Sequence, residues 1–287
     1  DPDLVELARL DVEERGADTF LEGVPVVATD APAKLGLDEL REALDDLLTT
    51  VPAAEDRGRP RLWVDRVFAA RGAGTVVTGM LTDGVLRVGD EVEVQPAGVG
   101  ARIRALQNHH EEREELPPGT RCALNLVGVA HTQVQRGDVV VGPGQWHLAT
   151  VVDASLRVLD QLDHSVSRRG AHVAYLGAGE HPVRMRILGP EALKPGGEGS
   201  VRLFLPRSLP LLPGDRFVLR ESGRSETVGG GCVLDVDPRE RASRARPDRS
   251  VDRVVRERGW VDSDELERLT GERREPDVGQ WVVDPEA

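Results

Sequence analysis

Residues 63–94 read WVDRVFAARGAGTVVTGMLTDGVLRVGDEVEV and decide how the chain folds. Their apolar residues form short β-branched groups that glycines separate, a rhythm typical of short antiparallel strands joined by tight turns. Asp83-Gly84 and Gly89-Asp90 are turn-forming pairs, placed where successive strands must reverse. The stretch therefore predicts an antiparallel meander of the kind that closes into a β-barrel.

Gly72, Gly74 and Gly79 also raise the question of a nucleotide-binding loop. A dinucleotide-binding fingerprint needs a third glycine where Val77 stands, and it needs a helix to follow. The residues that follow, VVTGML, are strand-like instead. We therefore interpret these glycines as bends and bulges of a barrel.

Length and composition limit the possible folds and functions further. The chain has 287 residues, of which 39% are hydrophobic and 30% charged, which fits two or three compact units. No apolar run is long enough to cross a bilayer, so we expect no membrane partner. The formal net charge of -13 argues against a general nucleic-acid binder, because phosphate contacts need a basic surface. Any RNA contact must therefore be local.

Cys122 and Cys232 each stand in a strand-like apolar context, which favours buried reduced thiols over a disulfide or a metal site. A reducing cytoplasm is the compartment that fits such thiols. The chain starts with Asp1, not Met, and enters helical sequence at once, so we expect a piece of a longer polypeptide.

Residues 1–52 have the pattern of a unit from an α/β sheet. Residues 4–14 and 37–48 carry apolar side chains on one helical face, and residues 24–28, VPVVA, predict a buried strand between them. So short a segment cannot complete such a sheet alone. Residues 53–60 are rich in proline, glycine and charge, which indicates a linker.

Two strand-rich regions follow, residues 61–144 and 145–238, and each predicts one antiparallel barrel. In the second region, Pro206, Pro210 and Pro213 are expected to interrupt the strands at barrel corners. The fold class that we expect is therefore mainly β, with two antiparallel barrels after an α/β segment.

The charge-dense segment 108–116, NHHEEREEL, is expected to be an exposed turn of the first barrel. His109 and His110 could suggest a metal site. Adjacent histidines point to opposite sides of a strand, however, and these two have no partner cluster in the sequence. We interpret them as part of a solvated loop.

Residues 239–287 differ in composition from the rest. The run 239–258 has eight arginines against four acidic residues, the only basic block in an acidic chain. A possible capping box at Asp262 and Glu265, a short helix and a strand follow, which is the opening pattern of a winged helix-turn-helix. The arginines fit either a phosphate-facing helix or a solvated, charge-balanced face, and we favour the solvated face.

The motifs D-R-V-F-x-x-x-G-x-G-T-V-V-T-G and G-x-L-x-V-G-D-E-V-E-V, within residues 65–94, resemble domain II of the translational GTPases. Asp65-Arg66 ahead of Val67-Phe68 is most similar to the selenocysteine-specific elongation factors, the SelB family. The resemblance implies barrels of the domain II and domain III types of elongation factor Tu. It also implies that residues 1–52 are the end of a GTPase domain and that residues 239–287 begin a winged-helix region.

In that family an Asp, a following basic residue and an Arg on a later strand are thought to form the pocket for the esterified selenocysteine. The resemblance carries these roles to Asp65, Arg66 and Arg121. A selenol is ionised near neutral pH, so guanidinium groups can hold it as a charged partner. The alternative is an ordinary ion pair between strands, Asp65 with Arg121.

The resemblance also implies a nucleotide contact at Ala28, where the family has a Ser-Ala pair that reaches the guanine base. The serine is missing here, and an ordinary strand-to-helix turn explains Ala28 as well. The phosphate loop G-x-x-x-x-G-K-[ST] is also absent from the sequence, because neither Lys34 nor Lys194 fits it. The chain by itself should therefore not hydrolyse GTP, although the family implies GTP and Mg²⁺ as cofactors.

The function that the resemblance implies is GTP-dependent delivery of selenocysteyl-tRNA to the ribosome at recoded UGA codons. A messenger-RNA hairpin, bound by further winged helices, would be the third partner. The closing segment 224–235 resembles the end of domain III, where Arg220, Arg224 and Gly229–Gly231 could approach an RNA backbone. Those glycines could equally let a strand bend. The alternatives are another elongation or initiation factor and, in a different class, a non-enzymatic barrel that acts as a binding module.

Overall fold

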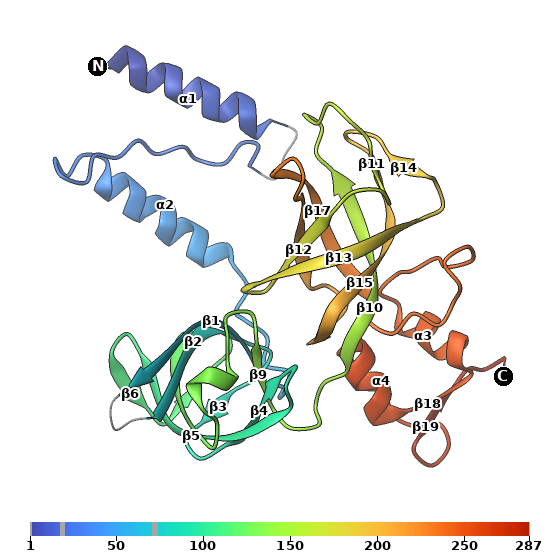
Figure 1. The fold of residues 1–287 in the computed structure, drawn as a ribbon. Coiled ribbons are helices and arrows are strands. Elements are labelled where there is room, and N and C mark those ends of the chain that lie inside the picture. The colour runs from blue at the N-terminus through green and yellow to red at the C-terminus, as the bar shows by residue number, and fades with distance from the viewer. Residues whose placement is uncertain (1, 18–20, 71–73, 287) are drawn as a thin grey trace. The chain divides into compact units, whose positions relative to one another are not determined.

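The computed structural model describes residues 2–17, 21–70 and 74–286. They divide into two compact units, residues 1–53 and 54–287, and each is described by itself (Figure 1). Among the described residues, no helix combines the length and apolar character that a membrane crossing requires. The larger unit is built almost wholly of antiparallel strands, so the prediction of a mainly β fold is confirmed.

The smaller unit contains two helices, α1 (Pro2–Gly16) and α2 (Leu37–Thr50), and both predicted helices are confirmed. The predicted strand at residues 24–28 is wrong, because this segment is unpaired backbone and the nearest pairing is one bridge between Asp30 and Leu35. A strand needs neighbours to satisfy its backbone hydrogen bonds, and the described residues of this unit supply none.

The first barrel, barrel 1, closes from six strands in the order β4-β9-β1-β2-β8-β5, with β5 pairing back onto β4 (Figure 1). Closure leaves no open sheet edge among these strands, which is the usual advantage of a barrel. Its strands are β1 (Arg61–Ala70), β2 (Gly74–Thr82), β4 (Glu91–Gln95), β5 (Val99–Asn108), β8 (Arg121–Val127) and β9 (Val139–Val141). Short elements complete it: β3 (Leu86–Arg87), β6 (Glu111–Arg113), β7 (Glu115–Leu116) and the 3-10 helix η1 (His131–Gln133).

The turns of barrel 1 lie where the sequence predicts them. Asp83 and Gly89 both have positive φ, the backbone conformation that their turns require. The segment 108–116 is mostly exposed, as expected, but it is a hairpin whose tip is His109-His110 and whose second arm is β6. No group of three or more possible metal ligands exists among the described residues.

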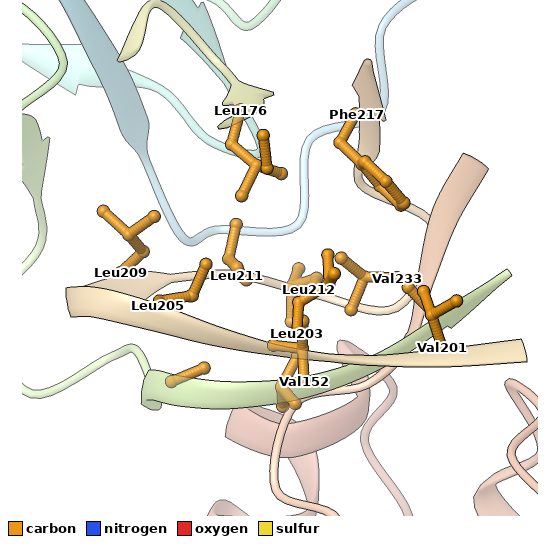
Figure 2. Packing of buried hydrophobic residues seen from close by; sticks show 14 of the residues in the cluster. Val152, Leu176, Val201, Leu203, Leu205, Leu209, Leu211, Leu212, Phe217 and Val233 are labelled. Carbon is orange, nitrogen blue, oxygen red and sulfur yellow. The ribbon is translucent and has the colours of Figure 1, made fainter. Parts of the chain in front are cut away.

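The second barrel, barrel 2, closes in the order β10-β15-β13-β12-β16-β17 (Figure 1). Alternate side chains of these strands point inward, and Figure 2 shows Val152, Leu203, Leu176 and Phe217 among the packed core residues. The strands are β10 (Leu148–Val158), β12 (His172–Leu176), β13 (Gly179–Leu188), β15 (Glu198–Pro210), β16 (Arg216–Glu221) and β17 (Glu226–Asp235). Two short strands, β11 (Val166–Ser167) and β14 (Ala192–Leu193), pair with each other beside the barrel.

The expectation that Pro206 interrupts a strand is wrong, because β15 continues from Glu198 to Pro210 through it. The pairing of β15 with β10 nevertheless jumps from Phe204 to Leu209. Pro206 falls inside this unpaired interval, where its missing N–H group leaves no ladder hydrogen bond unmade.

The glycine run in β17 serves close packing between strands. A Cβ atom on Gly231 would lie 1.9 Å from the carbonyl oxygen of Ser155, and one on Gly229 would lie 2.2 Å from the carbonyl oxygen of Arg157. Both carbonyls belong to β10, the strand that pairs with β17. These glycines therefore allow β10 and β17 to approach closely within the barrel wall. This agrees with the structural role for Gly229–Gly231 that the sequence analysis gave as the alternative to RNA contact.

The C-terminal residues form α3 (Val251–Arg258), β18 (Trp260–Asp262), α4 (Ser263–Thr270) and β19 (Trp281–Val283), with β18 paired to β19. Asp262 caps α4 by accepting hydrogen bonds from the backbone N–H groups of Asp264 and Glu265. The predicted helix and strand are thus present.

Two arginines of the basic block fit neither of the roles expected for them. Arg253 is buried and pairs with Asp235 at 2.8 Å, and Arg258 pairs with Asp237 at 3.0 Å. These partners lie at and just beyond the end of β17. The two arginines therefore attach α3 to barrel 2, because a buried guanidinium is tolerated only when it is paired.

We expect Gly231→Ala to destabilise the protein by about 3 kcal/mol, because the added methyl group overlaps a backbone atom that cannot move away independently. Gly223→Ala is the matched control, since a Cβ at Gly223 would meet no atom within 4 Å. Urea unfolding of both variants tests this. Equal stabilities would mean that the glycine run is not needed for packing.

Candidate functional site

The candidate site is built on a β-bulge in β1. Val64 pairs with Gly79 and Arg66 pairs with Thr78, so Asp65 is an extra residue with no partner position on β2. A bulge disrupts the regular alternation of a strand and turns the extra side chain in a new direction. The bulge therefore sets the direction of the Asp65 carboxylate.

Two groups from neighbouring strands hold this carboxylate. The Thr78 hydroxyl on β2 donates a hydrogen bond to Oδ1 of Asp65 at 2.6 Å. The Arg121 guanidinium on β8 donates to Oδ2. The side chain of Asp65 is 21% exposed and that of Arg121 is 54% exposed, so the pair lies at the surface of barrel 1. The structure thus brings together two of the three residues that the resemblance predicted for a pocket.

The environment keeps Asp65 ionised. Partial burial acts to raise the pKa of its carboxyl group, but the hydrogen bonds from Thr78 and Arg121 and the charges of Arg121 and Arg66 outweigh burial and lower it. At neutral pH the carboxylate is consequently a charged acceptor that fixes the position of Arg121.

Arg66, the third predicted residue, is exposed and forms no ion pair with any residue that the structure describes. It acts on Asp65 only through its charge. The site therefore has two guanidinium groups and one carboxylate, so an incoming anion would meet a local excess of positive charge.

Sequence reasoning missed two neighbours of the pair. Thr78 belongs to the V-V-T-G motif, and its role follows only from the bulge that brings Asp65 opposite it. Met80 lies directly opposite Arg121 in the β2–β8 ladder and is 44% exposed. It adds an apolar, polarizable wall beside the guanidinium.

Ala28, the weak candidate for a guanine contact, lies in the smaller unit in an exposed segment. A Cβ on Gly36, the residue that precedes α2, would lie 2.1 Å from the carbonyl oxygen of Ala28. The close approach needs glycine at position 36, where φ is +68°, and it makes the segment a compact loop that leads into the helix. This local geometry agrees with the simpler alternative, a turn before a helix.

The pH dependence of protein stability gives a direct test of the ion pair between Asp65 and Arg121. Because the folded state lowers the pKa, the ion pair should stabilise the protein above the unfolded-state pKa of about 3.9 and lose that effect as the pH falls through the folded-state value. We therefore expect Asp65→Asn to cost about 1 kcal/mol at neutral pH and progressively less below about pH 4. Urea unfolding at neutral and acidic pH measures the difference.

Glu112→Gln is the control for that experiment, because Glu112 is exposed on β6 and makes no ion pair within the described residues. It should leave the unfolding free energy unchanged at both pH values. A difference in unfolding free energy between wild type and Asp65→Asn that stays constant with pH would contradict the ion-pair explanation.

Two sequence families match the barrels. Residues 74–141 match the family described as elongation factor Tu domain 2, and residues 153–240 match the beta-barrel domain of selenocysteine-specific elongation factors. The first match includes β2 and β8, and the second includes most of barrel 2.

Curated relatives agree with these matches. A selenocysteine-specific elongation factor from Desulfomicrobium baculatum is 33% identical over 81% of this chain and 37% of its own length. Elongation factor 1-alpha from Archaeoglobus fulgidus is 30% identical over 63% of this chain and 47% of its own length. Elongation factor Tu 2 from Streptomyces avermitilis is 32% identical over 83% of this chain and 64% of its own length. The chain thus spans between about a third and two thirds of these relatives.

Solved structures share the fold. A bacterial selenocysteine-specific elongation factor, EF-Sec, superimposes with a TM-score of 0.79 at 21% identity, over all of this chain and 50% of that one. The apo form of SelB from Methanococcus maripaludis gives a TM-score of 0.69 at 19% identity, over 82% of this chain and 56% of that one. The resemblance predicted from the motifs is confirmed: with its two barrels, the chain is a relative of the selenocysteine-specific elongation factors within the translational GTPase superfamily.

Proposed function

We propose that this chain is the tRNA-holding part of a cytoplasmic factor that delivers selenocysteyl-tRNA to the ribosome at recoded UGA codons, in a GTP-dependent manner. The observation that carries the proposal is the pair Asp65 and Arg121, held at the surface of barrel 1 beside the unpaired Arg66. The similarity to selenocysteine-specific elongation factors supports it.

The chemistry of selenium explains why this arrangement would bind selenocysteyl-tRNA more tightly than seryl-tRNA. A selenolate carries a negative charge near neutral pH, and Arg121 and Arg66 can bind it with charge-assisted hydrogen bonds. A serine hydroxyl stays neutral and leaves the same guanidinium groups without a charged partner, which penalises seryl-tRNA. Asp65 would keep Arg121 in place, or would accept a hydrogen bond from the amino group of the aminoacyl ester.

The simpler explanation of the pair is an ordinary ion pair between strands. Exposed ion pairs contribute at most about 1 kcal/mol to stability, so stability alone gives little reason for one here. A bulge that aims Asp65 at Arg121 beside a second arginine is more elaborate than such a pair requires. Binding experiments separate the two explanations.

We expect Arg121→Ala, in this chain joined to a complete GTPase domain, to abolish the preference for selenocysteyl-tRNA over seryl-tRNA. The selenolate would lose its main cationic partner, so selenocysteyl-tRNA would bind more weakly. The neutral serine hydroxyl would lose little binding free energy. Titration of both tRNAs with GTP present measures the ratio of their dissociation constants.

Arg87→Ala is the matched control, because Arg87 is also an exposed arginine of barrel 1 and pairs with Glu115 at 3.1 Å. It should leave the ratio unchanged. Discrimination that survives Arg121→Ala would reject Arg121 as the selenolate contact and leave the ion-pair explanation.

The residues of this chain do not fit the family's cofactors, GTP and Mg²⁺. Lys34 lies in a tight turn with positive φ, and Lys194 directly follows the short strand β14. Neither lysine directly follows a glycine, as the phosphate-binding loop requires: Lys34 follows Ala33 and Lys194 follows Leu193. GTP binding on this proposal therefore belongs to a GTPase part whose phosphate loop these residues do not contain.

Residues 1–287 should accordingly show no saturable binding of a fluorescent GTP analogue, with or without Mg²⁺. Fluorescence titration of the purified chain tests this expectation. Saturable, Mg²⁺-dependent binding would contradict it and would give Ala28 and its loop a role in holding the nucleotide.

The alternative function is that of a general elongation factor, and the similarity to elongation factor Tu 2 and to elongation factor 1-alpha favours it. Such a factor would bind aminoacyl-tRNAs with neutral side chains as well as selenocysteyl-tRNA. The tRNA titrations distinguish the two functions. On our proposal the other partners are the ribosome and a messenger-RNA hairpin, and residues 239–287 are the start of the winged-helix region.

A further inference from the structure

Two of the four tryptophans of this chain lie at the surface of its C-terminal segment. Trp260 on β18 is 50% exposed and Trp281 on β19 is 39% exposed. The other two, Trp63 and Trp146, are buried. Tryptophan side chains that remain at a surface are enriched where proteins bind their partners. The fold alone therefore does not explain the exposed pair.

The exposed tryptophans share one face of the small sheet that β18 and β19 form (Figure 1). Asp262 stands opposite Trp281 in this ladder, and the neighbouring pair, Val261 and Val282, is buried in the hydrophobic core. Because side chains alternate between the two faces of a sheet, both indole rings lie on the side away from the core. Trp260 and Trp281 are diagonal neighbours on that side, a separation that aromatic side chains can bridge. We call these two residues the tryptophan face.

A hollow with a volume of about 450 Å³ adjoins the tryptophan face, because Val283, which lines the hollow, stands opposite Trp260 in the ladder. The hollow is lined by five carboxylates but only two guanidinium groups. One of these, Arg274, is already paired with the carboxylate of Asp252 at 2.6 Å. The hollow therefore carries an excess of negative charge. Its acidic residues are Asp252, Glu275, Asp277, Asp284 and Glu286.

Backbone hydrogen bonds fix two of these acidic residues beside the sheet. The carboxylate of Asp277 accepts a hydrogen bond from the backbone N–H group of Val283 at 2.8 Å, and its own N–H group donates to the carbonyl oxygen of Trp281 at 2.8 Å. The N–H group of Asp284 donates to the carbonyl oxygen of Gly259, directly before β18, at 2.8 Å. Acidic residues are therefore held beside both strands of the tryptophan face.

The buried tryptophans are both covered by arginines of the chain itself. The Arg61 guanidinium lies over the ring of Trp63 at 5.6 Å and over that of Trp146 at 4.7 Å. Arg59 also lies over Trp146, at 4.7 Å. Within the part of the chain that the structure describes, no cation lies over either ring of the tryptophan face. The exposed rings can therefore offer this favourable cation–π contact to a partner.

We propose that the tryptophan face and the acidic hollow beside it bind an arginine-rich segment of a partner protein. Indole rings attract guanidinium groups, and neighbouring carboxylates bind the same groups through paired hydrogen bonds. The aliphatic part of each arginine side chain would cover apolar surface of the rings at the same time. This interaction goes beyond the delivery of tRNA and does not rest on the proposed function.

Charge and size argue against other occupants. An RNA would bring its phosphates next to Glu275, Asp284 and Glu286, and these like charges repel. A second copy of this chain, docked by two-fold symmetry, would bring the acidic hollow against itself. Two aromatic side chains bury about 150–250 Å² each, well below the roughly 800 Å² per partner of a stable interface between folded proteins. The surface therefore suits a short segment.

The test uses residues 1–287 and a short fluorescein-labelled peptide in which arginine and glycine alternate, with binding followed by fluorescence anisotropy. A second peptide has lysine in place of arginine, which keeps the charge but not the planar guanidinium. We expect the arginine peptide to bind more tightly. Trp260→Leu with Trp281→Leu should weaken its binding about tenfold and abolish the preference over the lysine peptide, because leucine is apolar but has no π face. Trp260→Tyr with Trp281→Tyr should retain most of the preference.

Glu275→Gln with Glu286→Gln tests the acidic hollow and should weaken binding of both peptides about threefold. Its matched control is Glu112→Gln with Glu114→Gln, which removes the same charge from two exposed residues of barrel 1 that form no ion pair within the described residues. Equal affinities for the hollow variant and its control would overturn the inference. A wild-type chain that does not bind the arginine peptide, or binds both peptides equally, would also overturn it.

Two further measurements detect the other occupants. If a fluorescein-labelled single-stranded RNA binds the wild-type chain and the leucine variant loses that binding, the rings stack on bases and the inference is wrong. If the wild-type chain sediments as a dimer and the leucine variant as a monomer, the occupant is a second copy, which also contradicts it. We expect neither RNA binding nor self-association to change in the leucine variant.

Discussion

The buried guanidinium of Arg61 is the contact on which the arrangement of the two barrels depends. It is 5% exposed and donates to Asp83 in barrel 1 at 2.9 Å and to Asp215 in barrel 2 at 2.6 and 2.8 Å. Its face also lies over the ring of Trp146, in the segment between the barrels, at 4.7 Å. Burial acts to lower the pKa of Arg61, but the two carboxylates raise it overall, so the group stays charged. Removing one partner of such a buried pair leaves an uncompensated charge, which typically costs about 3–5 kcal/mol.

This constraint also acts on the candidate site in barrel 1. Arg61 is the first residue of β1, and the Asp65 bulge interrupts the same strand a few residues later. In barrel 2, Arg207 on β15 donates to Asp138 of barrel 1 at 2.6 Å and provides a second tie between the barrels. Because β1 carries both Arg61 and the Asp65 bulge, these two ties connect the strand of the candidate site to barrel 2. Pre-organisation of this kind lowers the entropy lost on binding a large ligand.

The sequence predicts those parts of the structure that local patterns control. Alternating apolar residues and turn pairs such as Asp83-Gly84 are enough for the barrels, and the motif around Asp65 is enough for its resemblance to a known pocket. Features that depend on distant partners were missed. The stretch 24–28 is apolar enough for a strand but finds no strand to pair with among the described residues. Arg253 looked solvated because its partner Asp235 lies on another element. Thr78 became recognisable only once the bulge placed it against Asp65.

The roles of the individual arginines are the feature that the sequence predicts least well. This chain has only two lysines, Lys34 and Lys194, so nearly every cation is the same residue type and composition cannot separate their roles. Counter-charges separate them: Arg61 is neutralised between elements, Arg121 is held by one surface carboxylate, and Arg186 has no acidic partner among the described residues. The net charge of an acidic protein therefore does not exclude a site that is locally positive. Acidic residues neutralise the structural arginines, and an arginine without a counter-charge among the described residues, such as Arg66 beside Asp65, is where an anion gains most from binding.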